Sequence, residues 1–493
     1  MKYQPVIGLE THVELKTKSK MFCSCLNDPN ERHPNVNICP VCLGHPGTLP
    51  VINKEAVRKT IKTGLALNCQ IPEYSKFDRK NYFYPDLPKG YQISQYDKPL
   101  CLGGFLEIEG KKIRITRVHL EEDTGRLVHE KDYSLVDFNR AGIPLMELVT
   151  EPDLTSAKEA RKFAEELQLI LRYLGVSDAD MEKGQLRVEV NISLLCGATK
   201  QTRNRTGNYA KNKLGTKVEI KNLNSFRAVE RALEYEIKRQ AKILESGKKV
   251  IQETRGWDDI KGVTVGQREK EEAHDYRYFP EPDLPPLHNT KEFVNEIRAE
   301  IPELPQQRRE RLAKEYKLDK KSIEVFVQNK DLGEYFEKVI SEFDPNLPRE
   351  KLFQLIKLAT NYLITDLQGL LKRASVTGED FLITPENFAQ FITLIYDGKI
   401  SSKIAKQVLS EMFSTGADPS YIIEEKGLTQ ITDVAEIEKI IKEVISKNKK
   451  AVEDFKKGKD NAFQYLIGQI MARTKGKANP QIVRDILQKT LTK

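Results

Sequence analysis

The chain has 493 residues, which at roughly 150 residues per domain predicts about three domains. Its 80 Lys+Arg and 72 Asp+Glu give a net charge of +8, and 39% of the residues are hydrophobic, so a small disulfide scaffold and a mostly disordered chain are excluded. No run approaches the about 18 apolar residues that cross a bilayer, and the N-terminus lacks the apolar stretch of a secretion signal. We therefore expect a cytoplasmic protein with reduced cysteines and no membrane contact.

Strands are predicted where polar and apolar residues alternate in the first part of the chain. Residues 6–15 alternate strictly, with Glu10 and His12 on the polar side and Ile7, Leu9 and Val13 among those on the other. The same alternation predicts strands over residues 186–192 and 218–223.

Two helices are predicted between and after these strands. The first covers residues 156–174, and the second begins after Asn224 or Ser225. Gly175 and Gly247 follow the last apolar positions of the two helices, where a left-handed residue commonly ends a helix.

A proline-rich segment marks the end of the first domain. Residues 280–286 (PEPDLPP) can neither continue a helix nor lie inside a sheet, and the patterns beyond them are helical, as over residues 351–371. A second break falls near Gly398, and Pro480 follows an asparagine as the first residue of a last helix. We predict an α+β fold with three domains: a mixed or antiparallel sheet domain over residues 1–292, a helical domain over 293–400 and a small helical tail domain over 401–493.

Four of the seven cysteines form two close pairs, Cys23/Cys25 and Cys39/Cys42, separated by 13 residues. Four thiolates in two pairs can surround a zinc ion tetrahedrally and leave no open position, so the spacing predicts a structural zinc site. Two alternatives stay open: four thiols without a metal, and Cys42 as the nucleophile of a glutaminase. The second is disfavoured because Pro40 stands where such a nucleophile turn needs glycine.

Acidic residues gather in the strand and loop segments of the first domain. Glu10, Glu122 and Glu151 can supply the carboxylate oxygens that Mg²⁺ prefers. His12 lies beside Glu10 on the same strand and is an unusual ligand for Mg²⁺, which leaves a softer metal or a hydrogen-bonding role open. The plain alternative is a solvated, salt-bridged face.

Residues 76–91 interleave cations with aromatic rings, a pattern that can bind phosphate and stack a base. Lys80 and Lys89 in this stretch can neutralise phosphate charge. The chain contains neither of the two common glycine-rich phosphate-binding motifs, so any ATP must be held by metal and side chains.

Several long runs together resemble the GatB family, the B subunits of the tRNA-dependent amidotransferases. The similar runs, which extend over essentially the whole chain, are residues 6–15, 76–91, 119–123, 137–147, 218–226, 274–283, 401–406 and 468–471.

The resemblance implies one chain of the GatCAB heterotrimer, with GatA and GatC as partners. It implies a catalytic cradle domain, a helical domain and a tail domain similar to YqeY proteins. The family activates the side-chain carboxylate of Glu-tRNA(Gln), and in many organisms Asp-tRNA(Asn), with ATP, and ammonia from the glutaminase GatA then displaces phosphate. Carried onto this chain, the resemblance implies ATP and Mg²⁺ at Glu10, His12, Glu122 and Glu151, with structural Zn²⁺ at the cysteines.

The tail carries over half of the formal charge excess, because residues 401–493 hold 17 Lys+Arg and 12 Asp+Glu. Since the resemblance places a tRNA-contacting domain here, we predict that its cations contact phosphates. A solvated helix face is the plain alternative, and a non-catalytic tRNA-binding scaffold is the alternative for the whole chain. The predicted tRNA contacts are Lys447, Lys449, Lys450, Lys456, Lys457, Lys459, Arg473, Lys475 and Lys477.

Overall fold

The computed structural model describes most of the chain. The described residues are 3–28, 30–196, 214–269, 276–372, 375–428, 434–456, 458–474, 478 and 480–491. They pack as two compact units, residues 1–305 and 306–493.

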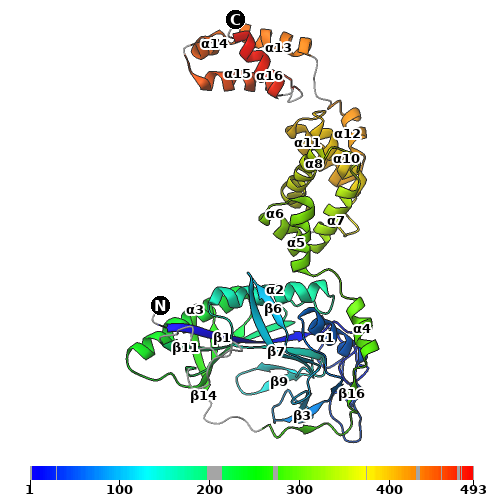
Figure 1. Ribbon diagram of the computed structural model, residues 1–493, viewed down its shortest axis with the longest axis vertical. Helices are drawn as coiled ribbons and strands as arrows, with labels where there is room; N and C mark the ends of the chain where they lie inside the picture. The colour runs from blue at the N-terminus through cyan, green and yellow to red at the C-terminus, as the bar shows by residue number, and fades with distance from the viewer. Residues whose placement is uncertain are drawn as a thin grey trace. The chain divides into compact units, whose positions relative to one another are not determined.

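A nine-stranded sheet forms the centre of the first unit, in the order β14-β13-β12-β11-β1-β10-β7-β5, with β6 paired to β7 (Figure 1). Neighbouring strands are antiparallel except for β12 and β13, which are parallel. The sheet is therefore mixed, as predicted. Its strands are β1 (Tyr3–Glu14), β5 (Cys101–Leu102), β6 (Phe105–Ile108), β7 (Lys111–Glu122), β10 (Pro144–Thr150), β11 (Leu186–Cys196), β12 (Val218–Leu223), β13 (Glu253–Asp258) and β14 (Val263–Glu269).

Helices α2 (Ala157–Tyr173) and α3 (Phe226–Glu245) lie side by side against one face of this sheet (Figure 1). Both begin as the sequence predicts, because the hydroxyls of Ser156 and Ser225 accept hydrogen bonds from the first-turn N–H groups. Gly175 and Gly247 follow their last turns with φ of 65° and 78°.

The apolar sides of the strands pack with these helices into one core, and the polar sides of the same strands form the opposite face of the sheet. Ile7, Leu9 and Val13 of β1 are almost fully buried in that core together with Phe163 of α2. Helix α1 (Lys54–Ala66) packs against β5 and β7, and α4 (Lys291–Ala299) packs against α1. Short strands complete the unit: β2 (Tyr74–Ser75) with β16 (Leu287–His288), β8 (Arg126–His129) with β9 (Ser134–Asp137), and β3 (Asp78–Asn81) with β4 (Tyr91–Ser94) and β15 (Phe279–Pro280).

The second unit is helical. The helix predicted over residues 351–371 begins as α8 and continues through a π-helical stretch, η3, into α9. The elements are α5 (Pro305–Tyr316), α6 (Lys320–Gln328), α7 (Lys330–Ser341), α8 (Arg349–Asn361), η3 (Tyr362–Leu367), α9 (Gln368–Leu371), α10 (Pro385–Tyr396), α11 (Ser402–Thr415), α12 (Pro419–Glu425), α13 (Val434–Lys447), α14 (Lys449–Lys456), α15 (Asp460–Arg473) and α16 (Pro480–Leu491).

The two units together confirm the predicted α+β class. The boundaries at residues 292 and 400 stay predictions; α4 packs on the first unit, and α11 packs against α10. In the described part of the chain, the helices are too short or too polar to cross a membrane.

Candidate functional site

The polar face of the sheet carries a row of charged side chains across four neighbouring strands. His12 of β1 lies opposite Glu147 of β10 on one side and Arg187 of β11 on the other, and Glu147 lies opposite His119 of β7. The strand register thus joins residues that lie up to 175 positions apart in the sequence.

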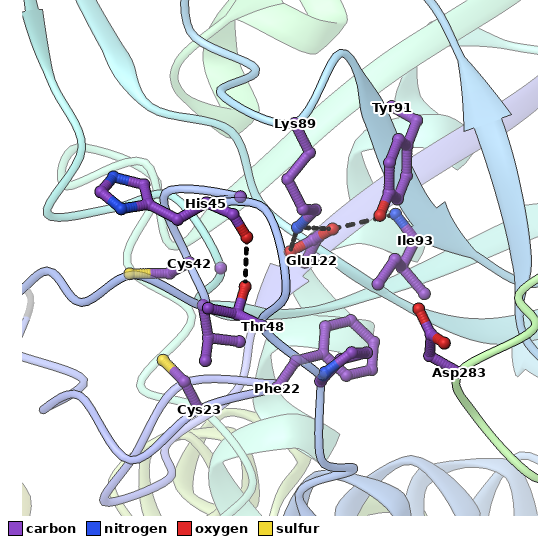
Figure 2. A pocket seen from close by; sticks show the side chains of 14 residues that line it. Phe22, Cys23, Cys42, His45, Thr48, Lys89, Tyr91, Ile93, Glu122 and Asp283 are labelled. Atoms are coloured by element: carbon purple, nitrogen blue, oxygen red, sulfur yellow. Dashed lines mark hydrogen bonds and ion pairs between the residues drawn. The ribbon is translucent and has the colours of Figure 1, made fainter.

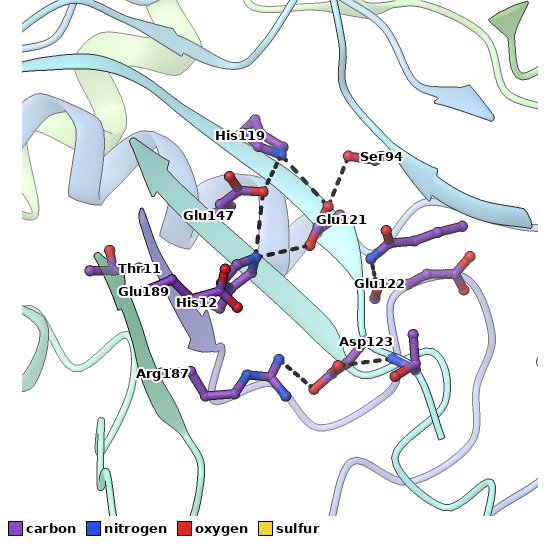
Figure 3. A network of polar contacts seen from close by, with 12 residues as sticks. Thr11, His12, Ser94, His119, Glu121, Glu122, Asp123, Glu147, Arg187 and Glu189 are labelled. Carbon is purple, nitrogen blue, oxygen red and sulfur yellow. Dashed lines mark hydrogen bonds and ion pairs between the residues drawn. The ribbon is translucent and has the colours of Figure 1, made fainter. Parts of the chain in front are cut away.

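Three side chains of this face form a first cluster of metal-ligand type: His12, Glu121 and Glu147 (Figure 3). One ligand atom from each lies within 4.8 Å of the others. The Nε2 atom of His12 is 3.5 Å from a Glu147 oxygen and 3.8 Å from a Glu121 oxygen, and His119 Nε2 lies 3.2 and 3.6 Å from the same two carboxylates. Two buried carboxylates are therefore held between two imidazoles.

The electrostatics of this cluster keep its carboxylates ionised. Burial acts to lower the pKa of His119, but the negative charges of Glu147 and Glu121 outweigh it and raise the pKa to about 9. Burial acts to raise the pKa of Glu147, yet His119 and His12 hold it well below its usual range. Glu121 and Glu147 are therefore ionised over the physiological pH range, and the protonated imidazole of His119 compensates part of their charge.

Lys80 brings a cation to the same cluster from the small sheet. Burial alone would lower its pKa, but the negative charges of Glu121 and Glu147 raise it. The Lys80 ammonium also lies 4.9 Å from the ring centroid of Tyr276 and 5.9 Å from that of Tyr82, within cation–π range. The predicted cationic residue is thus placed beside the acidic residues.

A second acidic cluster lies further along the same face and consists of Glu10, Glu189 and Glu219, whose ligand oxygens also lie within 4.8 Å of one another. Asn191 donates to Glu10 at 2.7 Å. Lys221 Nζ lies 2.9 Å from Glu189 and 3.7 Å from Glu219. The two clusters share strand β1, on which Glu10 and His12 are two residues apart.

The structure does not bring the four predicted Mg²⁺ ligands together into one cluster. Glu10 lies in the second cluster and His12 in the first, whereas Glu122 and Glu151 belong to neither of the clusters formed by the described residues. Glu151 accepts a hydrogen bond from Thr116 Oγ1 at 2.8 Å.

Glu122 points away from His12 because neighbouring residues on a strand face opposite sides (Figure 3). Its carboxylate oxygens lie 2.5 and 2.6 Å from Lys89 Nζ and accept the backbone N–H of Ile93 at 2.9 Å. Lys89, the second predicted phosphate-binding cation, is therefore the ion-pair partner of Glu122.

Four acidic residues of these clusters are not among the site residues predicted from the sequence: Glu121, Glu147, Glu189 and Glu219. The alternation of the strands contains the signal for two of them, because Glu189 and Glu219 occupy polar positions of predicted strands. Glu121 shares a face with His119, two residues before it.

The four predicted zinc ligands, Cys23, Cys25, Cys39 and Cys42, do come together, with all Sγ atoms within 4.8 Å. All four are free thiols. A hydrogen bond from Cys23 lowers the pKa of Cys42 to about 4, against the effect of burial, and the backbone N–H of Cys39 and the Lys20 ammonium act in the same direction. Four thiols around one centre, one of them ionised readily, can hold a metal ion.

A cavity of about 60 Å³ separates this quartet from the Glu122–Lys89 pair (Figure 2). Cys23 and Cys42 line it on one side, Glu122 and Lys89 on another, and Asp283 closes a third. Members of the predicted zinc site and of the predicted Mg²⁺ and phosphate site thus border the same cavity.

The predicted tRNA-binding cations that the structure describes lie on or next to α13, α14 and α15, which enclose a core of their own together with α16. Lys459 pairs with Asp454 at 3.0 Å and Arg473 with Glu443. Lys457, Lys475 and Lys477 lie outside the described residues. The other six predicted cations are described by the structure and are all exposed: Lys447, Lys449, Lys450, Lys456, Lys459 and Arg473.

Comparison with known proteins finds the same family over nearly the whole chain. The model of the GatB/GatE catalytic domain matches residues 5–295, and that of the GatB domain matches residues 334–491. The chain is 51% identical over 502 residues to the B subunit of the aspartyl/glutamyl-tRNA(Asn/Gln) amidotransferase of Caldicellulosiruptor saccharolyticus, with 100% of both chains covered. It is 50% identical over 501 residues to the protein of the same name from Thermotoga maritima, with 100% of this chain and 99% of the relative covered. The chain therefore belongs to the GatB family.

Proposed function

We propose that the chain is the GatB component of a tRNA-dependent amidotransferase. Its reaction would be the ATP-dependent phosphorylation of the side-chain carboxylate of Glu-tRNA(Gln), Asp-tRNA(Asn) or both, followed by amidation. The observation that carries the proposal is the pair of acidic clusters, with Lys80, on the polar face of the sheet. The full-length similarity to proteins named as this component supports it.

We propose that each acidic cluster holds one divalent cation. Mg²⁺ prefers carboxylate oxygens and places opposite ligands about 4.2 Å apart, which the ligand atoms reach by small side-chain movements from 4.8 Å. Glu121, Glu147 and His12 would bind the first ion, and Glu10, Glu189 and Glu219 the second. Glu121 and Glu147 thereby take the places that the sequence analysis assigned to Glu122 and Glu151.

The side chains of this face fit the chemistry of carboxylate activation. A carboxylate is a poor acyl electrophile, and conversion to an acyl phosphate supplies a leaving group. Bound Mg²⁺ would neutralise phosphate charge during phosphoryl transfer. Lys80 adds a fixed positive charge beside the cluster, and His119 holds Glu121 and Glu147 in place through its ring nitrogen.

The nitrogen donor would come from a partner protein. Ammonia made from glutamine by GatA would displace phosphate, with GatC as the third member of the complex. The names of the relatives, which describe a subunit, support an assembly of several chains. The clustering of Cys42 with three other thiols supports a metal-binding role for it over a glutaminase nucleophile.

We also propose that the cysteine quartet holds a structural zinc ion. A tetrahedral Zn²⁺ with Zn–S bonds of about 2.3 Å places its sulfur atoms about 3.8 Å apart, so four Sγ atoms within 4.8 Å fit with little rearrangement. Four protein ligands leave no position for substrate, and the role is structural.

An amidation assay tests the proposed function. The complex with its partner proteins is given ATP, glutamine and each misacylated tRNA in turn, and amide formation and phosphate release are followed. We expect the Glu147→Gln variant to lose both activities with its fold retained, and the Glu151→Gln variant, whose carboxylate lies outside both clusters, to keep them. Full amidation by Glu147→Gln would refute a catalytic metal at the first cluster, and tRNA binding without amidation by the unmodified complex would show a scaffold.

The tail is tested through the salt dependence of tRNA binding. Replacing Lys456, Lys457 and Lys459 together by glutamine should weaken binding and lower the slope of log K against log salt by up to about 3 for double-helical contacts, since each lost phosphate contact lowers it by about 0.9. Unchanged affinity at several salt concentrations would refute the phosphate contacts.

The matched control neutralises three exposed lysines elsewhere in the second unit, Lys314, Lys320 and Lys321. This variant carries the same change in net charge, so an equal loss of affinity would show that the general field of the chain, not the tail, attracts tRNA.

A further inference from the structure

Lys20 is an unusual residue, because its side chain is fully buried (0% exposed) and is among the largest fully buried side chains of the described chain. Burying an ammonium group is costly unless an anion and hydrogen-bond acceptors compensate it. A lysine in this position therefore requires an explanation.

The partners of Lys20 identify the compensating groups. Its Nζ atom lies 3.8 Å from Cys42 Sγ and 3.2 Å from the carbonyl oxygen of Phe138. Among the described residues, no carboxylate lies within ion-pair distance of it. Glu122, which lies near the same place, is already engaged by Lys89. The anionic partner of Lys20 is thus the sulfur of Cys42.

The backbone around Lys20 belongs to the turn that carries the first cysteine pair. Its N–H donates to the carbonyl of Cys25 at 2.9 Å, and the N–H of Met21 donates to the carbonyl of Gly142 at 2.7 Å. The side chain therefore starts from the cysteine turn and is held in a fixed direction toward the second pair.

We propose that Lys20 is the counter-cation of the cysteine metal centre, and that it positions Cys42 and stabilises its metal-bound thiolate. The inference rests on the proposed zinc site. Four thiolates around one Zn²⁺ leave two uncompensated negative charges, of which a buried ammonium offsets one and donates an N–H···S hydrogen bond. The quartet is therefore built for a charged tetrathiolate and not for four neutral thiols.

Lys20 also ties the metal centre to the loop before β10. Its bond to Phe138 lies in this loop, and a side chain at Gly142 would meet Cys42 at 3.5 Å, Lys20 at 3.6 Å and Glu122 at 3.9 Å. Lys20 therefore contacts both the cysteine centre and the loop that leads to Glu147.

The experiment compares metal affinity in the full chain. Zinc content is measured after purification without added metal, and the affinity is then measured by competition with a chromophoric chelator. The test variant is Lys20→Met, which keeps an unbranched side chain only one atom shorter and removes its charge and donors. The matched control is Lys18→Met, the same substitution at an exposed position two residues away.

We expect the Lys20→Met variant to bind zinc about 10- to 100-fold more weakly, the loss typical when a group that hydrogen-bonds to a metal ligand is removed, and the control to bind like the unmodified chain. The charge-transfer band of the Co²⁺-substituted protein should also shift in Lys20→Met, because the thiolate loses a hydrogen bond. Equal affinity and an unchanged spectrum would overturn the inference. Absence of zinc from the unmodified chain, and failure to take up Co²⁺, would instead refute the zinc site itself.

A second variant keeps the test decisive where Lys20→Met does not fold. Lys20→Gln retains an N–H donor and loses the charge, so it is expected to fold and to bind zinc at least tenfold more weakly. Because the hydrogen bond to the thiolate is retained, the Co²⁺ charge-transfer band should stay close to its position in the unmodified chain. Unmodified affinity in this variant would show that the charge of Lys20 has no part in holding the metal.

Discussion

Glu121 and Glu122 are adjacent, chemically identical and on opposite faces of β7, which makes them a matched pair. We predict that Glu121→Gln removes metal binding with the fold intact, whereas Glu122→Gln lowers stability with metal binding intact. The reason is that Glu121 lies with His12 and Glu147, while Glu122 pairs with Lys89.

The cost of the Glu122→Gln change follows from its contacts. The side chains of Lys89 and Glu122 are only 11% and 4% exposed, and removing one member of a buried ion pair costs about 3–5 kcal/mol. The amide oxygen of glutamine still accepts the N–H of Ile93, which places the expected loss near the lower end, about 3 kcal/mol. For a unit of this size that corresponds to a fall in the melting temperature of about 6 °C.

The Glu121→Gln change should also cost some stability, because this buried carboxylate pairs with His119, although the change relieves the repulsion between Glu121 and Glu147. The main expected effect of Glu121→Gln is on Mn²⁺ affinity. Loss of a group that only hydrogen-bonds to a metal ligand lowers affinity about 10- to 100-fold, and loss of the ligand Glu121 itself should lower it by more. Thermal melts followed by circular dichroism and Mn²⁺ titration followed by electron paramagnetic resonance measure the two effects on the same samples. Loss of Mn²⁺ binding in Glu122→Gln with retention in Glu121→Gln would refute the assignment of faces.

Three further changes test other parts of the first unit. Burial acts to raise the pKa of Glu159, but the contact with Lys111 outweighs burial and lowers that pKa below 4.5. This carboxylate therefore stabilises the fold above pH 4.5 and ceases to do so as the pH falls through its lowered pKa. Urea unfolding of Glu159→Gln should show a lower free energy of unfolding at pH 7 and no difference in acid, and a difference independent of pH would contradict this. Gly64→Ala should lower the melting temperature by the equivalent of about 1–3 kcal/mol, since the new Cβ would lie 2.3 Å from the sulfur of Cys101, and Cys101→Ala should restore part of the loss. Glu236→Leu should cost about 3–5 kcal/mol in the same melts, because this fully buried carboxylate accepts several hydrogen bonds; a loss below 1 kcal/mol would show that its partners find other acceptors.

Elements of the fold that depend on local pattern could be predicted from the sequence. The strand at residues 218–223 has the predicted bounds, and α2 begins after Ser156 as its capping pattern indicates. The strands of the first unit and the helices of the second were equally accessible, because periods of two and of about 3.6 differ along the sequence.

The candidate site was predictable in part. The cysteine quartet follows from spacing within 20 residues, which the chain can fold around one centre. The acidic clusters depend on strand register. An error of one residue in the predicted register places a side chain on the opposite face, as between Glu121 and Glu122. No local pattern reveals that β10 lies between β1 and β7, so Glu147 could not be paired with His12 from the sequence.

The central place of β1 has a consequence for synthesis of the chain. This first strand pairs with β10 and β11, and Tyr3 at its start lies opposite Cys196. At about 5–20 residues per second, roughly 10 to 40 s pass between the appearance of β1 and that of the last residue with which it pairs. The edges of β1 thus keep unpaired backbone N–H and C=O groups during this time, and exchange of β1 between chains is the misassembly that this order of synthesis favours.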